Sequence, residues 1–506
     1  MIDDALLLGV DVGTTNCKAL VFDRAGRLHG SGSLPTPAQR PRPGWVEYDP
    51  ELLWQAVVEV VRQALSQTEP ARVRGLAVAS MAEAGLLLDT AGRPLQPIIS
   101  WNDSRSDQHY RRWLDRFGAM AFFQIAGNPA NPTFSVFKLI WLREHAPAAY
   151  AAAARWLHVA DYIAFRLCGE QATDYSLAAR TMLFDLAQLR WSDQIIAAAG
   201  LRADLLPEVV PGGTRIGAVT ATAALAAGLP AGTAVGVGGH DHICGALAAG
   251  AYVEGVGLDS MGTAEPAFLP LNTLRLPQAA GPTGCSFGAH VAPGQYYALK
   301  SIRSSGAAVA WANQALGFGG AYVRMQAAVA RAPAGSRGVL FLPRLAPIDR
   351  GAFVGLRSEA GTGELARAVY EGLAYQWRSN LETIESAIQA RAETIRVIGG
   401  GTRSAVWVQI KADVLGRPLR VLDMQESVAL GAALLGGLAA GVYHDLAEAA
   451  AGLRFTELTI VPDPIRAEFY DRCYHQVFLR IAPALEDIHQ AIGAIPLAKD
   501  ELADWP

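Results

Sequence analysis

A five-residue motif occurs twice in this chain, and the second copy begins about half a chain length after the first. The first copy is Asp11-Val12-Gly13-Thr14-Thr15, and the second, 249 positions later, is Ser260-Met261-Gly262-Thr263-Ala264. A chain of 506 residues is too long for one hydrophobic core. Because each copy lies near the start of a half, we predict a duplication with two domains, residues 1–248 and 249–506.

The residues that follow the first copy predict strands that alternate with helices. Two apolar runs, residues 6–12 and 19–23, indicate a β-hairpin whose tip is Gly-Thr-Thr. Asp49 is a typical N-cap for a helix through Leu65. Residues 73–79 and 97–101 are expected to be strands, and alanine-rich helical stretches continue to about residue 227. This alternation is typical of the α/β class.

Composition and charge exclude several classes of protein. Hydrophobic residues make up 51% and charged residues 18%, which favours large cores over disorder. The net charge of −4 argues against nucleic acid as the main partner. The five cysteines are scattered without a CxxC pair, which favours a reduced compartment. With no signal peptide and only short or interrupted apolar runs, such as 428–442, we expect a cytoplasmic protein with no membrane partner.

The first copy has the residue types that phosphoryl transfer needs. Such chemistry uses close backbone N–H groups, hydroxyls and a carboxylate that holds a metal ion. Gly13 lets the backbone approach phosphates, Thr14 and Thr15 can donate hydrogen bonds, Asp11 can hold Mg²⁺, and Lys18 could add positive charge. An ordinary hairpin turn is the alternative.

The second copy lacks the acid, because Ser260 stands where the first copy has Asp11. Gly262 and Thr263 repeat the phosphate-binding part of the motif. Two such tips can hold a triphosphate from two sides. The asymmetry predicts one metal-binding side and one phosphate-binding side.

A third candidate follows the apolar run 234–237. Asp241 comes after Gly238-Gly239-His240, in an expected glycine-rich turn at the end of a strand, where it can accept the proton of an attacking hydroxyl and orient Mg²⁺. The alternative role for Asp241 is the N-cap of the helix that follows. His240 and His242 are expected to line the pocket, because no further ligands cluster with them.

A fourth glycine-rich stretch, residues 399–404, lies between an expected strand and a helix. Its glycines permit close approach of a nucleoside, and a helix N-terminus favours negative charge. The stretch lacks the lysine of the P-loop and differs from the dinucleotide fingerprint.

Taken together, these stretches resemble the FGGY family of carbohydrate kinases over nearly the whole chain. The matching stretches, in the family's order, are Asp11–Thr15 with Phe22-Asp23, Trp101-Asn102-Asp103-Ser104-Arg105, Gly238–Asp241, Gly399–Pro418 and Glu426–Ala433. The resemblance implies an α/β fold of two actin-like (ribonuclease H-like) domains with an interdomain cleft. It also implies transfer of a phosphoryl group from Mg·ATP to a sugar hydroxyl, with the sugar and the phosphates on the N-terminal side and the nucleotide on the C-terminal side.

The resemblance assigns roles residue by residue. Asp241 would be the base, and Asp11 and Asp241 would lie near the metal. The residues implied to contact ATP are Gly13, Thr14, Thr15, Lys18, Gly262, Thr263, Gly306, Gly400, Gly401 and Ser404. The residues expected at the sugar are Met81, Glu83, Trp101, Asn102, Asp103, His240 and Asp241.

The substrate is expected to be a ketopentose such as xylulose. Glu83, however, stands where xylulokinases place His and where glycerol kinases place Glu, and Ala82 replaces the Arg that precedes this Glu in glycerol kinases. A polyol, another ketose or a sugar acid therefore remain alternatives. A sugar acid would need Arg105 or another cation to offset the charge of Glu83. Glu83 could instead be an acid on a surface helix.

Other classes of protein are weighed against the kinase. An actin-like ATPase without a sugar substrate would use the same tips but would give Trp101 and Asp103 only structural roles. A sugar-binding regulator without catalysis is disfavoured by the intact acids. A Rossmann oxidoreductase is disfavoured because GxGxxG does not follow the first strand. A homodimer is an open alternative to a monomer.

Overall fold

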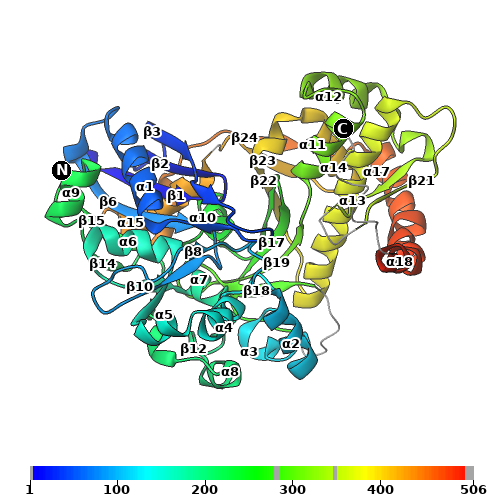
Figure 1. Ribbon diagram of the computed structural model, residues 1–506. Coiled ribbons are helices and arrows are strands. Elements are labelled where there is room, and N and C mark those ends of the chain that lie inside the picture. The colour runs from blue at the N-terminus through cyan, green and yellow to red at the C-terminus, as the bar shows by residue number, and fades with distance from the viewer. Residues whose placement is uncertain (1–3, 278–283, 346–349, 425, 496–506) are drawn as a thin grey trace.

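The computed structural model describes residues 4–277, 284–345, 350–424 and 426–495, and two large sheets organise them (Figure 1). The N-terminal sheet has the strand order β14 (Arg215–Ala218), β15 (Ala234–His240), β6 (Val73–Ser80), β1 (Leu6–Val12), β2 (Asn16–Asp23) and β3 (Leu28–Pro35). The C-terminal sheet has the order β18 (Ser286–Ala289), β19 (Tyr296–Ile302), β17 (Glu265–Leu271), β16 (Val256–Ser260), β22 (Thr394–Ile398), β23 (Leu419–Leu422) and β24 (Glu457–Ile460).

The two sheets share one arrangement around their central strands. In the N-terminal sheet, β1 pairs antiparallel with β2 and parallel with β6, and β6 pairs parallel with β15. In the C-terminal sheet, β16 pairs antiparallel with β17 and parallel with β22, and β22 pairs parallel with β23. The α/β class that the alternation of strands and helices predicted is confirmed, and the repeated arrangement is what a duplication would produce. The exact boundary after residue 248 stays a prediction.

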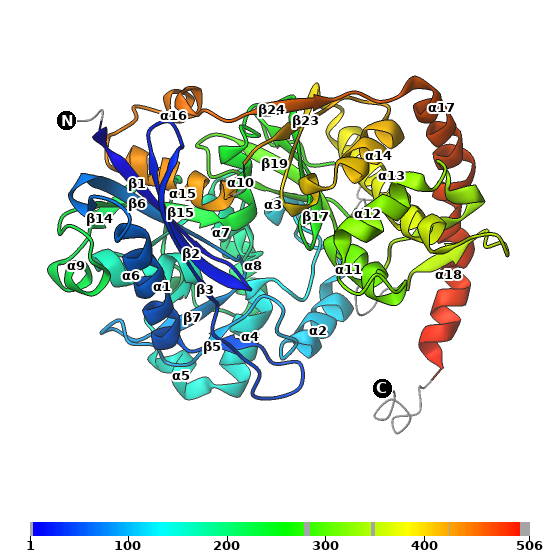
Figure 2. The ribbon, with the colours of Figure 1, turned by 90° about the horizontal axis from the view of Figure 1, so that it is seen from above.

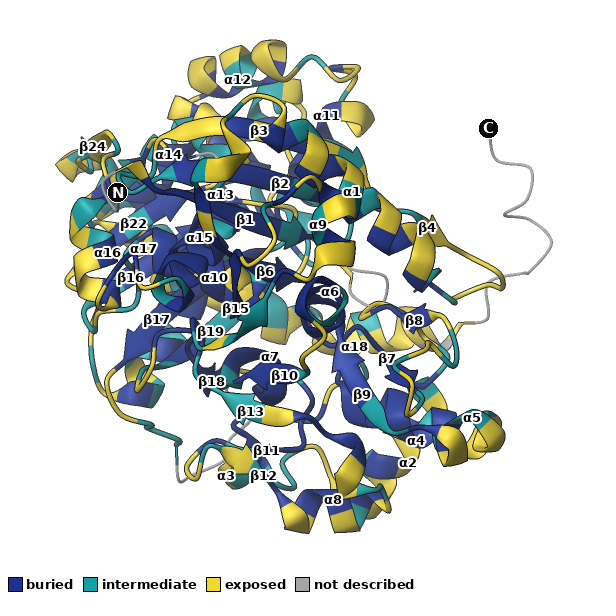
Figure 3. Cartoon of the chain, turned by 90° about the vertical axis from the view of Figure 1, so that its left-hand side faces the viewer, coloured by how far each residue is buried: buried dark blue, intermediate teal, exposed yellow. Residues whose placement is uncertain are grey.

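Alternating side chains along β1 and β2 cover both faces of the N-terminal sheet, as the two-residue period of a strand requires. Val10 and Val21 pack on one face with helices α1 (Pro50–Leu65) and α6 (Val159–Cys168). Leu7 and Phe22 pack on the other face with α10 (Asp241–Ala248) and α15 (Ser427–Ala439). Figure 3 shows these strands and helices as mostly buried.

Helix α15 comes from the C-terminal part of the chain but covers the N-terminal sheet. It packs against β1, β6 and β15, while β23 and β24, which flank it in the chain, belong to the other sheet (Figure 2). The approach is so close that a Cβ at Gly9 would lie 1.7 Å from the carbonyl oxygen of Ala429. Glycine at position 9 therefore lets the helix dock on the strand, and the apolar run at 428–442 is a buried helix as predicted.

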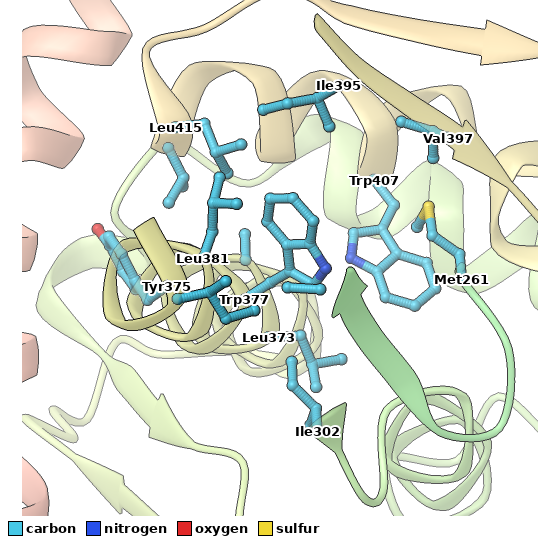
Figure 4. Close-up of a cluster of buried hydrophobic side chains, with 14 of the residues drawn as sticks. Met261, Ile302, Leu373, Tyr375, Trp377, Leu381, Ile395, Val397, Trp407 and Leu415 are labelled. Atoms are coloured by element: carbon cyan, nitrogen blue, oxygen red, sulfur yellow. The ribbon is translucent and has the colours of Figure 1, made fainter. Parts of the chain in front are cut away.

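The helices of the C-terminal half pack on its sheet and on one another. The principal ones are α11 (Gly306–Ala315), α12 (Tyr322–Arg331), α13 (Thr362–Ile388), α14 (Ala405–Leu415) and α17 (Pro464–Cys473). Figure 4 shows part of the core between them, where Trp377 of α13 lies beside Trp407 of α14 and Trp407 lies beside Met261. The core therefore reaches the residue that precedes Gly262.

The remaining elements extend the two halves. A smaller sheet contains β4 (Ala38–Gln39), β5 (Glu47–Tyr48), β8 (Ile98–Ile99), β7 (Gly85–Leu88) and β9 (Arg155–His158). The short strands elsewhere are β10 (Ala172–Asp174), β11 (Phe184–Asp185), β12 (Arg190–Trp191), β13 (Glu208–Val210), β20 (Leu340–Leu342) and β21 (Ala352–Val354). The other helices are α2 (Asp107–Phe117), α3 (Phe123–Ala126), α4 (Ser135–His145), α5 (Pro147–Ala152), α7 (Tyr175–Ala179), α8 (Asp193–Ala199), α9 (Ala221–Ala227), α16 (Leu446–Gly452) and α18 (Leu479–Ala494).

Several local predictions are confirmed and two need correction. The hairpin of β1 and β2 forms, and Asp49 caps α1 by accepting the N–H groups of Glu51 and Leu52 at 2.8 and 2.9 Å. The strand expected at 97–101 is only Ile98–Ile99, because the chain turns after it. Gly238 and Gly239 lie inside β15, where a turn was expected.

Candidate active site

The glycines of β15 create a bulge that directs the end of this strand. Gly236 pairs with Ala77 and Gly239 pairs with Ala79, so two residues of β15 stand opposite Val78 alone. A Cβ at Gly238 would lie 1.8 Å from the carbonyl oxygen of Val78, so only glycine fits there. Bulges of this kind commonly re-aim side chains next to active sites.

Asp241 follows the bulged strand as the first residue of α10. The N-cap position belongs to His240, so Asp241 is not the cap of this helix. Its Oδ1 accepts the N–H of His242 at 2.6 Å and lies 3.2 Å from Nε2 of His240. Burial alone would raise the pKa of Asp241, but His242 and His240 outweigh it and lower this pKa to about 2. Asp241 is therefore an ionised carboxylate throughout the neutral range.

Asp11 supplies a second carboxyl group and is the last residue but one of β1. Burial and, next, the charge of Asp241 raise the pKa of Asp11 to about 8. Its Oδ1 is buried and has no hydrogen-bond partner among the described residues. An unpaired carboxylate oxygen beside another carboxylate is an arrangement that a hard cation such as Mg²⁺ would satisfy. The donor set thus fits the expected metal.

The tip of the first hairpin, residues 13–15, is held by hydrogen bonds on both sides. Gly13 donates its N–H to the carbonyl oxygen of Asn16 at 3.0 Å and accepts the Thr36 hydroxyl at 2.7 Å. Thr14 Oγ1 accepts the indole N–H of Trp101 at 2.9 Å. The structure therefore joins a residue expected at the phosphates to one expected at the sugar.

Lys18 lies further along β2, directly opposite Asp11 in the strand register. Its Nζ donates to both carboxylate oxygens of Glu426, at 2.8 and 3.0 Å, so its charge is already compensated. Lys18 and Glu426 line a cavity of about 640 Å³ between β2, β3 and residues near α15. Asp241 and the two tips do not line this cavity, so we do not assign the reaction to it.

The second tip, residues 260–264, meets the other residues expected at the nucleotide. Gly306 donates its N–H to the carbonyl oxygen of Gly262 at 3.0 Å, and Ser305 donates to that of Thr263 at 2.9 Å. Gly401 donates its N–H to the carbonyl oxygen of Met261 at 3.1 Å. The second tip, the start of α11 and the glycine-rich turn before α14 are thus joined by backbone hydrogen bonds, although they span more than 130 positions of the sequence.

Gly400 and Ser404 lie beside this cluster. A Cβ added at Gly400 would meet no atom within 4 Å, so the backbone there borders open space. Ser404 is buried directly before α14, and its N–H bonds to the carbonyl oxygen of Gly401 at 3.0 Å. The geometry is compatible with an adenosine contact at Gly400.

Glu83 is neither on a helix nor on the surface. It follows β6 with φ of 59°, a left-handed conformation that is rare for residues other than glycine, and it is only 5% exposed. Oε1 of Glu83 accepts the Nε–H of Arg180 at 2.6 Å and is also paired with Nη2 of Arg180. Such strain often marks functional sites.

Sequence reasoning missed Arg180. This residue directly follows α7 and is 97 positions from Glu83, so nothing local signals the pairing. Nη1 of Arg180 also donates to the amide oxygen of Asn128 at 3.4 Å. Burial opposes the shift, but the charge of Glu83 and, less strongly, that of Asp241 raise the pKa of Arg180. Arg180 is thus placed near both acids.

The structure gives Asp103 a different surrounding from the one expected of a sugar ligand. Its two carboxylate oxygens accept Nε–H and Nη2–H of Arg105, each at 2.8 Å, and the N–H of Val46 at 2.6 Å. Its side chain has 0% exposure. Arg105 also pairs with Glu47 at 2.8 Å and lies 3.8 Å from the ring centre of Trp45. These bonds leave neither Asp103 nor Arg105 free for a ligand.

The other residues expected at the sugar differ in exposure. Trp101 is 37% exposed, and Asn102 is exposed with its Oδ1 accepting the Ser100 hydroxyl at 2.8 Å. Met81 and His240 are 2% and 7% exposed. Ligand atoms of His240, Asp241 and His242 lie within 4.8 Å of one another, so both imidazoles border the carboxylate.

Two family models match the sequence of this chain. Residues 6–248 match the family model described as the N-terminal domain of the FGGY family of carbohydrate kinases, and residues 259–440 match the model of its C-terminal domain. The described residues contain no helix long and apolar enough to cross a membrane.

Curated relatives and solved structures align along most of the chain. The chain is 32% identical to a xylulose kinase of Klebsiella pneumoniae, over 96% of this chain and 100% of the relative. It is 32% identical to a glycerol kinase of Bordetella parapertussis, over 88% and 91%. The crystal structure of a xylulose kinase from Rhodospirillum rubrum superposes with a TM-score of 0.88 at 30% identity, and the match covers 96% of this chain and 100% of that one.

Proposed function

The chain belongs to the FGGY family of carbohydrate kinases and is an ATP-dependent sugar kinase; from this premise we propose that it phosphorylates a ketopentose such as xylulose, with Asp241 as the base. The observation that carries the role of Asp241 is its position. It is an ionised carboxylate at the start of α10, and its charge acts on Asp11 and on Arg180.

Asp241 accepts the hydrogen bond of the attacking hydroxyl and later its proton. A carboxylate with a pKa of about 2 is a weak base, but the transition state of phosphoryl transfer is loose and needs little proton abstraction early in the reaction. The main contribution of Asp241 is therefore to hold the hydroxyl in line. His240 and His242 fix the carboxylate in that position.

Asp11 and Asp241 would hold Mg²⁺, which supplies positive charge to the oxygens of the transferring phosphoryl group when it is bound. Gly13, Thr14 and Thr15 would bind the phosphates from the N-terminal side, and Gly262 and Thr263 from the C-terminal side. No hydrogen bond joins the two tips among the described residues. We propose that ATP bridges the two tips, and closure of the two halves would exclude water from the reaction.

Gly306, Gly400 and Gly401 border the proposed nucleotide site. The hydrogen bonds from Gly306 and Gly401 hold the second tip from two sides. The open space next to Gly400 would take the adenosine, with Ser404 nearby. We propose that residues 1–248 bind the sugar and the phosphates and that residues 249–506 bind the nucleotide. Lys18 would act indirectly, through its pairing with Glu426 beside Asp11.

Glu83 and Arg180 support the sugar end of the site. Oε1 of Glu83 is engaged by Arg180, whereas Oε2 accepts no hydrogen bond within the described ranges. That oxygen can accept a sugar hydroxyl, while the guanidinium donates to a neighbouring one. The pair has no net charge, so a neutral sugar or polyol suits the site better than a sugar acid. Trp101 would pack its ring against the C–H face of the sugar. Asn102 and His240 would add polar contacts, and Met81 would pack against the bound sugar.

A polyol such as glycerol is the second candidate acceptor, and one observation favours it. The sequence lacks an arginine next to Glu83, but Arg180 supplies a guanidinium to the same carboxylate from another segment. The first candidate rests on the named xylulose kinases, which match over their full length.

An ATP-coupled assay with D-xylulose, D-ribulose, glycerol, erythritol and gluconate tests the proposal. We expect the highest kcat/KM with a ketopentose and the lowest with gluconate. If glycerol or erythritol has the highest value, the acceptor is a polyol. ATP hydrolysis that no acceptor stimulates would contradict the assigned sugar and indicate an actin-like ATPase.

A further inference from the structure

Two buried carboxyl groups flank the second tip. Asp259 is the last residue but one of β16, Glu265 is the first residue of β17, and both are 0% exposed. The tip lies between them in the sequence. Any group that fixes both carboxyl groups therefore fixes both ends of the tip.

Lys411 of α14 is such a group. Its Nζ donates to Oδ2 of Asp259 and to Oε1 of Glu265, and the residue is 0% exposed. These contacts span 152 and 146 positions of the sequence. One ammonium group thus joins helix α14 to the two strands that carry the tip.

The network continues to the start of α11. Oε2 of Glu265 accepts the hydroxyl of Ser305. The backbone of Ser305 donates to the carbonyl oxygen of Thr263 at 2.9 Å, and Gly306 donates to that of Gly262 at 3.0 Å. The chain of contacts from Lys411 through Glu265 and Ser305 therefore ends on the two tip residues that are proposed to bind phosphate.

The surroundings of Lys411 explain how a charge is tolerated there. Its Nζ lies 5.0 Å from the ring centre of Trp377 and 6.0 Å from that of Trp407, and these two indoles are visible in Figure 4. A cation over aromatic faces is attracted by them. Burial raises the pKa of Asp259 well above its usual range, which favours the neutral form of one of the two carboxyl groups that face Lys411.

A buried ionic cluster is a poor way to gain stability. Desolvation costs several kcal/mol per ion, and replacing such clusters by neutral groups is often neutral or stabilising. The ionic cluster fixes geometry instead, because its charged hydrogen bonds are directional. We infer that Lys411 is a positioning residue, which holds the second tip and the start of α11 in the geometry that binds the phosphates of ATP. This inference rests on the proposed function of the tip.

The first test separates positioning from stability. Lys411→Met alone leaves two buried carboxyl groups without a partner, so it is expected to be less stable. The triple variant Lys411→Met with Asp259→Asn and Glu265→Gln removes all charges together and is expected to retain the fold. We expect the KM for ATP of this variant to rise at least tenfold, while the KM for the sugar stays within about twofold.

Ser305→Ala provides a milder second variant. It removes the link between Glu265 and the tip but leaves Lys411 and both carboxyl groups in place. We expect a small loss of thermal stability and a rise of about three- to tenfold in the KM for ATP, which is the range for the loss of one ordinary hydrogen bond. This variant decides the question if the triple variant does not fold.

A matched control exists in the same half. Arg367 and Glu371 of α13 form another buried ion pair, at 2.7 Å, but they contact Tyr470 and the C-terminal end of α12 instead of the tip. The double variant Arg367→Met with Glu371→Gln is expected to leave the KM for ATP unchanged.

The outcomes distinguish the inference from the proposed function. If wild-type enzyme is active and both the triple variant and Ser305→Ala retain the wild-type KM for ATP, Lys411 only stabilises the fold and the inference is wrong. If the Arg367 control raises this KM equally, the effect is general and the inference is again wrong. If wild-type enzyme binds no ATP analogue by calorimetry, the function of the tip fails, whatever the variants do.

Discussion

Gly306→Ala is a small change with a calculable effect on the second tip. A Cβ at position 306 would lie 2.6 Å from the carbonyl oxygen of Gly262, whereas such contacts essentially never fall below 3.0 Å. The tip must therefore move by about 0.4 Å or more, and the 3.0 Å hydrogen bond from Gly306 to this oxygen must change. Gly306 does not have a positive φ, so alanine causes no backbone strain of its own.

The displacement approaches the tolerance of about 0.5 Å within which catalytic groups must be held. A misplacement of about 1 Å can cost a hundredfold in rate. We therefore expect kcat/KM for ATP to fall roughly ten- to a hundredfold, which corresponds to about 1.4–2.7 kcal/mol of transition-state stabilisation. The better helix propensity of alanine, up to about 1 kcal/mol, offsets part of the steric cost to stability.

The measurement is an ADP-coupled assay with varied ATP at saturating sugar, together with thermal unfolding. Gly400→Ala is the matched comparison, because its Cβ meets no atom within 4 Å and moves no backbone. It is expected to raise the KM for ATP with little change in kcat. If Gly306→Ala retains kcat/KM within twofold of wild type, the tip does not act in ATP binding as argued.

Three further changes test other parts of the structure. Trp101→Phe removes the 2.9 Å hydrogen bond to Thr14, so the KM for the sugar should rise about fivefold, the loss of about 1 kcal/mol; an unchanged KM would contradict a sugar contact. Glu83→Gln removes the acceptor charge, so kcat/KM for the sugar should fall about ten- to a hundredfold with an unchanged KM for ATP; equal loss for both substrates would indicate misfolding instead. Burial lowers the pKa of His290 to about 3. Below pH 6.5 this side chain is therefore protonated in the unfolded state but stays neutral in the folded state. The free energy of unfolding should therefore fall by about 2 kcal/mol from pH 7 to pH 5 because of His290. In urea titrations at these two pH values, His290→Gln should reduce the fall by this amount. His29→Gln, a change at an exposed site, should not reduce it.

Local sequence patterns predicted the features that depend on neighbouring residues. The hairpin of β1 and β2, the Asp49 cap and the buried helix at 428–442 follow from apolar runs and single capping residues. The repeated motif predicted a duplication, and each copy lies between corresponding strands, β1 and β2 in the first half and β16 and β17 in the second. These inferences need no knowledge of tertiary contacts.

Pairings between distant segments could not be predicted in the same way. Asp103 was expected at the sugar, but the N–H of Val46, 57 positions away, and Arg105 occupy its carboxylate. Glu83 meets Arg180 and Lys411 meets Asp259 over 97 and 152 positions. A single sequence does not encode such pairs locally, because the complementary charge can come from any segment that the fold brings near.

We propose that Asp241 acts on the sugar hydroxyl while ATP binds elsewhere in the site. The most direct test compares wild type with Asp241→Asn, which keeps the shape and removes the charge. We expect sugar phosphate formation, followed by ³¹P NMR, to fall by about two to four orders of magnitude, while calorimetry shows ATP binding within a few-fold of wild type. Near-normal phosphorylation by Asp241→Asn would contradict the role of Asp241 as the base.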